Sequence, residues 1–362
     1  MKIGIDARLY GTKHRGLGRY VKKLVDGITE INTKNQYVIF FTKDNINEFK
    51  SKNAKVKKVE MNARWYSLKE QLVVPRVIHS QKVDLMHFPH FNVPLSYNQR
   101  FIVTIHDLII DHFPDSRATN LPNWRYRVKL LGYKKILRHA VNQAEKIIVP
   151  SNFVKTDLTS LYQIPEDKIK VIYEGYFLDE AHAAADIARL GINKPFFLYV
   201  GAAYPHKNLE KLVESFTLVN KKNNYQLVLA GKTDEFFIRL SQRVNDHNII
   251  FTGYVAEGEL KKLYQEALLY VFPSLYEGFG LPAIEAQAHC LPVVSSNRSS
   301  MPEILGDSAI YFNPDNAADL AEKINMVISD HKLRARLIQN GLLNIKKFSW
   351  LKMISETGDF YQ

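Results

Sequence analysis

Cysteine is almost absent from this sequence of 362 residues, since Cys290 is the only one. A disulfide within the chain is therefore excluded, and a zinc site built on cysteines has no support. Apolar runs of 18 residues are also missing, so we expect no transmembrane helix. Asp6 and Arg8 stand where a secretory signal would be apolar, which leads us to expect a cytoplasmic protein.

Acidic residues are scarce in one half of the chain. Residues 1–175 contain 30 Lys and Arg against 16 Asp and Glu, whereas residues 176–362 contain 19 against 21. A basic half is typical of a protein that meets an anionic surface, such as nucleic acid, anionic lipid headgroups or a phosphorylated acceptor. The alternative is that the excess only aids solubility. No RNA-binding or DNA-binding motif accompanies the charge, so we do not expect nucleic acid as a partner.

The length of the chain suits two domains. Short apolar runs alternate with helical patterns throughout, which predicts an α/β fold with parallel sheets covered by helices on both faces. The first series of strands and helices occupies residues 1–175. After the polar segment 176–194, a second series begins at Pro195. We therefore expect two Rossmann-like, doubly wound domains, 1–175 and 176–349, that face a central cleft.

The most informative stretch, residues 276–289, follows a predicted strand and combines a glycine turn with the start of a helix. Gly278 and Gly280 lie in the turn, and Pro282 begins the helix. This arrangement directs backbone N–H groups and the positive end of a helix dipole at one place. Glycines also let a ligand approach the backbone closely. The sequence therefore predicts an anion-binding loop here.

Two carboxylates bracket this loop, Glu277 before the glycines and Glu285 in the first turn of the helix. Singly, each is compatible with an ordinary solvated or dipole-facing glutamate. Together, Glu277-Gly-Phe-Gly-Leu-Pro-x-x-Glu285 resembles the signature of the retaining glycosyltransferases of family 4, which have the GT-B fold. The resemblance implies that Glu277 faces the transferred sugar and that Glu285 binds the ribose hydroxyls. It implies that the donor diphosphate and sugar are held by Gly278, Phe279, Gly280 and Leu281.

A second match to the family lies at residues 196–208, where a predicted strand leads into a loop. We expect Asn208 to cap the following helix, which places Lys207 between a strand end and a helix N-terminus. This position suits an ammonium group that binds phosphate, and the resemblance gives Lys207 that role. The family pattern has an arginine where this chain has Ala202. His206 or a residue of the first domain could compensate for it.

The first domain has its own glycine-rich segment, a loop predicted over residues 10–17 that leads into a helix. Gly16 and Gly18 match half of a dinucleotide fingerprint, but Val21 stands where the third glycine should be. The family resemblance instead implies that Gly16 and Gly18 border the donor phosphates. It further implies contacts to the nucleobase from the backbone of Tyr254 and Val255.

Three histidines, His87, His90 and His106, stand at or near the ends of predicted strands of the first domain. Ligands gather at strand carboxyl ends in doubly wound sheets, although a single histidine there is usually structural. His106 resembles the family histidine that faces the donor sugar and the acceptor, so we expect it to act in catalysis with Lys207 and Glu277. For His87 and His90 we favour a structural role over lining the acceptor cleft.

Much of the basic excess falls in a predicted helix at residues 121–144, which also contains Trp124. Aromatic and basic residues on one helix favour contact with an anionic membrane surface. The alternative is a solvated basic face beside a core stripe of Val128, Leu131 and Leu137. The membrane interpretation extends the expected location to the cytoplasmic face of the inner membrane, as a peripheral protein.

The resemblance covers nearly the whole chain and is most specific at residues 196–208 and 268–305. It implies that the last helix, residues 350–362, crosses back onto the first domain. The chain has no Asp-x-Asp pair, the usual carboxylate arrangement for holding Mg²⁺ against a nucleotide diphosphate. We therefore expect no metal and no other cofactor, with the charge of the leaving group stabilised by protein groups alone.

These observations predict transfer of a sugar from a nucleotide-diphosphate sugar to a hydroxyl of a glycan or lipid-linked acceptor, with retention at the anomeric carbon. The chain resembles bacterial mannosyltransferase-like members that build surface polysaccharides such as lipopolysaccharide. GDP-mannose is therefore the first expected donor and a UDP-hexose the next. Two alternatives stay open, a nucleotide-sugar epimerase of the same fold and a non-catalytic protein that binds nucleotide sugars or an anionic surface.

Overall fold

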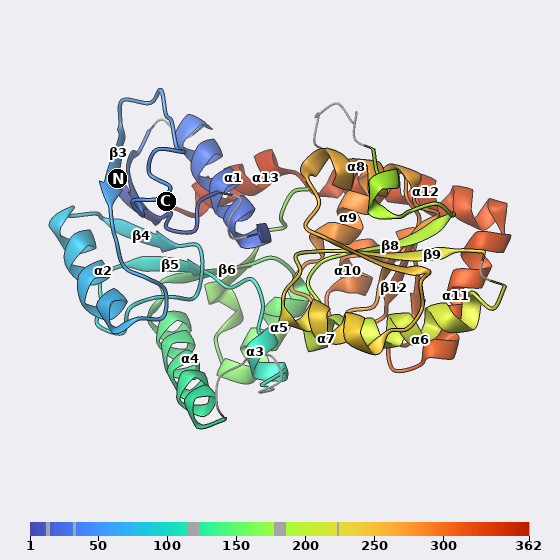
Figure 1. The fold of residues 1–362 in the computed structure, drawn as a ribbon. Coiled ribbons are helices and arrows are strands. Elements are labelled where there is room, and N and C mark those ends of the chain that lie inside the picture. Colours follow the sequence, from blue (N-terminus) through green and yellow to red (C-terminus); the bar gives the residue numbers. More distant parts are fainter. Residues whose placement is uncertain (12–14, 32–33, 115–122, 177–185, 223, 362) are drawn as a thin grey trace. The chain divides into compact units, whose positions relative to one another are not determined.

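The computed structural model describes the chain except for residues 12–14, 32–33, 115–122, 177–185, 223 and 362. The chain folds into two compact units, Met1–Gly175 with Ser349–Gln362, and Tyr176–Phe348. Each unit is built on a parallel sheet covered by helices (Figure 1). The predicted α/β fold with two doubly wound sheets is therefore confirmed.

Within the described residues, the sheet of the first unit has seven parallel strands in the order β3-β2-β1-β4-β5-β6-β7. The strands are β1 (Lys2–Asp6), β2 (Gln36–Phe41), β3 (Val56–Glu60), β4 (Leu85–Phe88), β5 (Phe101–Thr104), β6 (Lys146–Val149) and β7 (Ile169–Val171). The central strands β4 and β5 are fully buried because helices cover both faces. The edge strand β3 carries two lysines and a glutamate exposed to solvent, which discourages pairing with another chain.

The helices of the first unit include the C-terminal one, which joins this unit from the far end of the sequence. They are α1 (Arg15–Ile31), α2 (Leu68–Ser80), α3 (Ile109–His112), α4 (Asn123–Gln143), α5 (Asn152–Tyr162) and α13 (Trp350–Phe360). Gly27 of α1 lets α13 approach closely, because a Cβ atom there would lie 2.1 Å from Cδ1 of Ile354. Met353 and Ile354 of α13 are buried in the same core as the apolar face of α1.

The second unit repeats the plan with a sheet that has six strands among the described residues, in the order β10-β9-β8-β11-β12-β13. The strands are β8 (Phe196–Val200), β9 (Gln226–Ala230), β10 (Ile249–Gly253), β11 (Leu269–Phe272), β12 (Val293–Ser296) and β13 (Ala309–Phe312). All pairings are parallel, so the carboxyl ends of neighbouring strands meet at one edge. This shared edge brings the loops after β8, β11 and β12 together.

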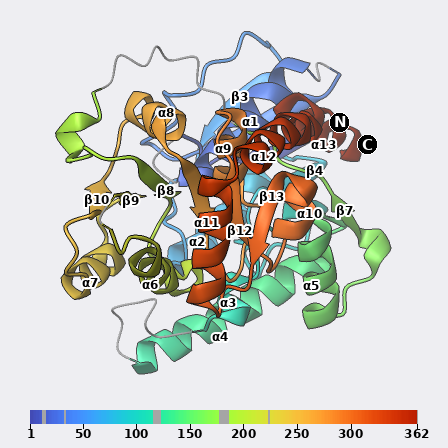
Figure 2. The ribbon, with the colours of Figure 1, turned by 90° about the vertical axis from the view of Figure 1, so that its right-hand side faces the viewer.

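The helices of the second unit cover both faces of its sheet. They are α6 (Leu209–Val219), α7 (Glu235–Arg243), α8 (Glu257–Glu266), α9 (Leu281–Ala288), α10 (Met301–Leu305), α11 (Ala317–Ser329) and α12 (His331–Asn344). In Figures 1 and 2, α6 and α7 lie on one side of β8 and β9, and α8 and α9 lie on the other. Apolar residues of α6, α7, α11 and α12 form one core with the sheet.

Several elements differ from the sequence-based expectation. Helix α7 was not predicted, although Asp234 caps it by accepting hydrogen bonds from two backbone N–H groups. The short elements α10 and β13 were also not predicted, because four or five residues carry too little periodicity. In α4, the alternative of a core stripe is wrong, since Val128 and Leu131 are exposed and only Leu137 of the three is buried.

None of the helices in the described part of the chain is both long and apolar enough to cross a membrane. The longest, α4, carries six Lys and Arg residues.

Candidate active site at the carboxyl edge of the second sheet

The loop after β8 presents Lys207 at the carboxyl edge of the sheet. Pro205–Lys207 form a short 3-10 turn, and Asn208 has left-handed backbone angles with φ at 58°. The expected cap by Asn208 is wrong, because a capping side chain needs an extended backbone at that position. Its amide instead donates to the carbonyl oxygens of Pro273, at 3.3 Å, and Pro314, at 2.8 Å. Asn208 thus ties the Lys207 loop to two other loops.

The loop after β11 presents Glu277 directly to Lys207. The Nζ atom of Lys207 lies 2.5 Å from Oε1 of Glu277, and the Ser274 hydroxyl donates to the same oxygen at 2.6 Å. A backbone bond from Leu275 N–H to the His206 carbonyl, 2.7 Å long, joins the two loops. The structure therefore brings two of the three predicted catalytic residues into one ion pair. Their side chains keep 18% and 10% of their surface exposed, which leaves the pair accessible from solvent.

The loop after β12 holds Glu277 from the other side. The Glu277 N–H donates to the Ser299 hydroxyl at 3.0 Å, and the Ser300 hydroxyl donates to the Glu277 carbonyl at 2.9 Å. Ser274, Ser299 and Ser300 were not predicted as site residues. Their only sequence signal is their position after strands that prove to be neighbours in the sheet.

The glycine loop and α9 follow Glu277. Gly280 has φ at 98°, a left-handed conformation, and a Cβ atom there would lie 2.5 Å from Cε of Met301. A glycine is therefore required by both backbone and space. Phe279 is buried and packs edge-on against Phe348, with ring centroids 5.4 Å apart. These contacts fix the loop in front of the N-terminus of α9.

Glu285 lies in the second turn of α9 rather than the expected first turn, because the helix begins at Leu281. The Tyr264 hydroxyl donates to Oε2 of Glu285 at 3.3 Å. Both residues are largely buried, and Tyr264 also stacks on His289. Tyr264 orients the predicted ribose-binding carboxylate and was not singled out in the sequence.

Tyr254 and Val255 follow Gly253, the last residue of β10, at the same carboxyl edge. Tyr254 is exposed and Val255 is partly buried. Strand β10 is separated from β8 by β9, so these residues flank the Lys207–Glu277 pair rather than contact it.

His206 differs from the arginine of the family pattern in that its ring carries no permanent charge. Burial, together with the charge of Lys207, lowers the pKa of His206 to about 3. The ring is therefore neutral near pH 7 and supplies no positive charge.

His106 follows β5 in the first unit and is held by two acceptors. Its Nδ1 lies 3.0 Å from Oε1 of Glu174, and its Nε2 lies 3.0 Å from the Pro89 carbonyl oxygen. Because neither an ionised carboxylate nor a carbonyl can donate, both ring nitrogens must carry protons and donate. Burial alone would lower the pKa of His106, but the hydrogen bond and charge of Glu174 outweigh it, so the pKa is raised. Glu174 was not singled out in the sequence, and its only signal is its position just beyond a predicted strand.

His87 lies in the same sheet but has the opposite protonation state. Its Nδ1 is hydrogen-bonded to the Tyr361 hydroxyl at 2.7 Å and its Nε2 to the Thr104 hydroxyl at 2.9 Å. Burial lowers the pKa of His87 to about 3, and that of His90 likewise. Both rings are neutral near pH 7. The bonds of His87 agree with the structural role that we favoured for it.

Gly16 and Gly18 lie inside the first turn of α1 rather than in the predicted loop, because the helix begins at Arg15. Gly16 is exposed and Gly18 is buried. Residues 12–14 of that predicted loop are outside the described residues. Sequence alone placed the helix start too late because glycine is a poor helix former.

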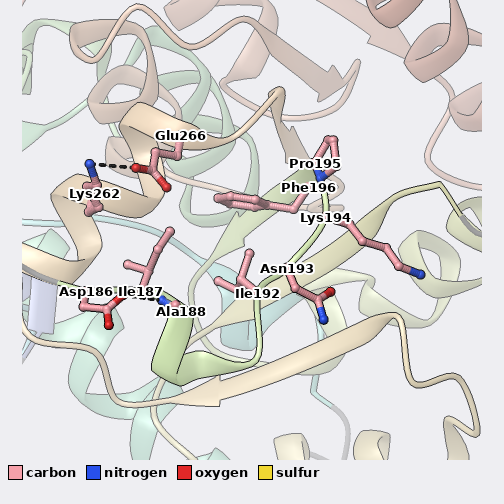
Figure 3. Close-up of a pocket in the computed structure, with 10 residues that line it drawn as sticks. All are labelled: Asp186, Ile187, Ala188, Ile192, Asn193, Lys194, Pro195, Phe196, Lys262 and Glu266. Atoms are coloured by element: carbon pink, nitrogen blue, oxygen red, sulfur yellow. Dashed lines mark hydrogen bonds and ion pairs between the residues drawn. The ribbon is translucent and has the colours of Figure 1, made fainter.

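A cavity of about 410 Å³ lies elsewhere in the second unit (Figure 3). It is lined by Pro195 and Phe196 at the amino end of β8, and by the Lys262–Glu266 ion pair of α8. Because the predicted site residues of this unit lie at the carboxyl edge, this cavity is not their site. In the described part of the chain, no group of three or more His, Cys, Asp or Glu side chains could hold a metal ion.

Comparisons with known proteins agree with this architecture. Residues 14–180 match the family described as Glycosyltransferase Family 4, and residues 184–343 match Glycosyl transferases group 1. The chain is 30% identical over 260 residues to the O-antigen chain mannosyltransferase RfbU of Salmonella typhimurium, covering 70% of this chain and 67% of that protein. It is 28% identical over 301 residues to the O-antigen chain mannosyltransferase B of Escherichia coli, covering 79% and 76%.

Among solved structures, HepE of Anabaena in complex with UDP-glucose superposes with a TM-score of 0.75 at 16% identity, covering 100% of this chain and 99% of that one. The two Rossmann-like parallel sheets are those of the GT-B fold. The chain belongs to the family 4 glycosyltransferases.

Proposed function

We propose that this glycosyltransferase moves a hexose from a nucleotide-diphosphate sugar to a hydroxyl of a glycan or lipid-linked acceptor, with retention and without a metal. The second unit would bind the donor and the first unit the acceptor. GDP-mannose is the first candidate donor, because the two similar curated proteins are mannosyltransferases by name. A UDP-hexose is the next, because the similar HepE structure contains UDP-glucose.

The Lys207–Glu277 ion pair is the observation that carries this proposal. It joins the ends of two adjacent strands beside the N-terminus of α9, where an anionic ligand is stabilised. An entering diphosphate would exchange Glu277 for phosphate oxygen as the partner of Lys207. The freed carboxylate would then meet the sugar ring. A preorganised donor of this kind contributes about 3 kcal/mol to stabilising the leaving group.

Retention follows in this proposal from attack on the face of the sugar that the phosphate leaves. The bond from the anomeric carbon to the phosphate oxygen breaks, and a bond to the acceptor oxygen forms on the same face. The acceptor proton passes to the departing phosphate oxygen. Glu277, still held by the Ser274 hydroxyl, would position the sugar and stabilise positive charge at the ring.

His106 would act in this scheme as a fixed cation on the acceptor side. Both of its N–H groups already donate, to Glu174 and to the Pro89 carbonyl, so it has no lone pair to accept a proton. The leaving phosphate rather than His106 would therefore be the base. The proposed setting is assembly of surface polysaccharide at the cytoplasmic face of the inner membrane.

The test is incubation of the purified protein with GDP-mannose or UDP-glucose and a panel of glycan and lipid-linked acceptors, with and without EDTA. We expect acceptor-dependent release of one nucleoside diphosphate, unchanged by EDTA. The proton spectrum of the new glycosidic bond should show the same anomeric configuration as the donor. An inverted product would exclude front-face attack, and a reaction abolished by EDTA would exclude metal independence.

A further inference from the structure

The outward faces of α2 and α4 in the first unit are apolar where solvent-facing helices are normally polar. On α4, Val128 and Leu131 are 63% and 69% exposed, and Trp124 is exposed to a similar degree. On α2, Leu68 is 86% exposed and Leu72 also faces solvent. Single exposed apolar residues are ordinary, but a contiguous group marks an interaction surface.

The three residues of α4 form one stripe. Trp124, Val128 and Leu131 follow the spacing i, i+4, i+7 of one helix face. The buried residues Tyr133 and Leu137 lie on the opposite face of α4, which contacts β5 of the sheet. Helix α4 therefore has two apolar faces, of which only one is covered by its own unit.

Tyr66 connects the two helices at this surface. It directly precedes Ser67, the N-cap of α2, and the ammonium of Lys129 on α4 lies 5.8 Å from the centre of its ring. Phe91 contacts both Tyr66 and Tyr133 of α4, with ring centroids 6.1 and 5.1 Å apart. The exposed residues of α2 and α4 thus belong to one region of the unit.

The charged side chains that α2 and α4 expose are all basic. Helix α4 contains no acidic residue, and its six basic residues are all exposed: Arg125, Arg127, Lys129, Lys134, Lys135 and Arg138. On α2, Lys69 and Arg76 are exposed, whereas the only acidic residue, Glu70, is buried and pairs with Arg8. Two carboxylates lie nearby, since Asp107 is among the charges that act on Tyr66 and Asp111 accepts a hydrogen bond from Tyr133. The surface therefore combines apolar side chains with an excess of positive charge.

We propose that this surface, defined by Tyr66, Leu68, Leu72, Trp124, Val128 and Leu131, docks on an anionic lipid bilayer. Apolar side chains enter the boundary between headgroups and acyl chains, while the flanking Lys and Arg meet the anionic headgroups. A second copy of this chain fits poorly, because it would bring equal positive charges together. Nucleic acid would bind the Lys and Arg side chains through its phosphates, but it would leave the exposed leucines and valine without a partner. The inference goes beyond the proposed sugar transfer and does not depend on which donor is used.

The experiment is flotation of the full chain with vesicles of phosphatidylcholine alone or mixed with an equal part of phosphatidylglycerol. We expect binding only to the anionic vesicles, and weaker binding at high salt. Two triple variants separate the contributions: Trp124→Ser, Val128→Ser, Leu131→Ser, and Arg127→Gln, Lys134→Gln, Lys135→Gln. The charge variant should lose on the order of a hundredfold in partitioning, or about fivefold per charge. The apolar variant should lose at least on the order of tenfold.

Matched controls lie in the second unit. Leu218→Ser with Leu343→Ser removes two exposed leucines there, and Lys221→Gln with Lys222→Gln removes two exposed charges. Neither pair should change partitioning by more than about twofold, within ordinary surface-mutation effects. All substitutions are at exposed positions, and unchanged thermal unfolding would show that the fold is intact. The fluorescence of Trp124 should shift to shorter wavelength on anionic vesicles, with no such shift in Trp124→Phe.

Equal binding by the apolar variant and the unchanged chain would overturn the proposal. Loss of polyanion binding in the charge variant alone would then point to nucleic acid. Concentration-dependent dimerisation abolished by the apolar variant would point to a second copy. Vesicle binding is measured without any sugar substrate, so its failure and a failure of sugar transfer are distinguishable.

Discussion

Each unit has a buried or half-buried acid–base pair in the loops that follow its strands. The two pairs differ in whether the basic group can change its hydrogen-bond partner. Lys207 and Glu277 have long, flexible side chains and lie on two loops of the second unit. An ammonium has three donors that rotate, so Lys207 can exchange one partner for another. His106 of the first unit already donates both N–H groups, to Glu174 and Pro89. The second unit therefore holds an exchangeable cation and the first unit holds a fixed one.

The largest expected effect comes from breaking the exchangeable pair. Lys207→Met should lower kcat by on the order of 10²- to 10³-fold, because a preorganised charge at the leaving group is lost. Glu277→Gln keeps the shape and the Ser274 contact and should lower kcat by a similar factor. Steady-state kinetics with the accepted donor measures both.

Both residues act in the same bond-breaking step, so the double variant should cost little more than the worse single one. Lys211→Met is the matched control, because it removes a lysine from the exposed Lys211–Glu214 pair of α6. Wild-type kcat in Lys207→Met would remove Lys207 from the catalytic step.

The next effect should fall on binding rather than turnover. Glu285→Gln is expected to weaken nucleotide affinity by about 10- to 100-fold, the value of a hydrogen bond to a charged group, with kcat changed far less. Calorimetric titration gives the affinity directly. Glu266→Gln, an exposed glutamate paired with Lys262, is the control. Full affinity in Glu285→Gln would contradict the ribose assignment.

The fixed pair of the first unit makes a prediction about pH. Glu174 raises the pKa of His106 in the folded chain, so the pair stabilises the fold fully below the unfolded histidine pKa of about 6.5. This contribution is lost as the pH rises through the raised folded pKa. Glu174→Gln should therefore lower the free energy of unfolding by about 2 kcal/mol below pH ~6 and by less at alkaline pH.

Urea unfolding at the two pH values measures this difference. Asp157→Asn, which removes the carboxylate partner of His112 near the surface, should cost less than 1 kcal/mol. An equal loss for Glu174→Gln at both pH values would mean that His106 is not protonated in the fold.

The smallest expected effect is on the free energy of unfolding and concerns His87, which is neutral. Tyr361→Phe removes the hydrogen bond between His87 and the residue that follows α13, and should cost about 1 kcal/mol of unfolding free energy. The loss should not vary between pH 5 and 8, because the pKa of His87 is about 3. Tyr173→Phe, whose hydroxyl contacts Asn152 at an exposed position, is the control for loss of a tyrosine hydroxyl.

Local sequence patterns predicted most of the strands and the long helices. Continuous apolar runs such as Phe101–Thr104 and Phe196–Val200 require no knowledge of distant residues. Helix starts were less certain. Gly16 and Gly18 lower helix propensity, yet α1 includes them because its remaining turns pack on the sheet. At Asn208 the sequence instead predicted a helix cap that does not form. The side-chain amide donates to the carbonyl oxygens of Pro273 and Pro314 rather than capping its own helix.

The site could be predicted only where one segment carries it. Glu277, the glycines and Glu285 lie within nine residues of each other, so their pattern is visible in the sequence. Glu174 is 68 residues from His106, and Ser299 is 22 residues from Glu277. Such partners depend on which strands become neighbours, and sheet order is not written in any one segment. The exposure of Val128 and Leu131 was likewise decided by the orientation of α4 on its sheet.

The central claim is that the carboxyl edge of the second unit is a donor site that works without a metal. Titration calorimetry with GDP, UDP and ADP, with and without EDTA, tests it most directly. We predict saturable binding of one of these nucleotides, unchanged by EDTA and weakened in Lys207→Met but not in Lys211→Met. Absence of binding for all three nucleotides, or binding that EDTA abolishes, would contradict the account.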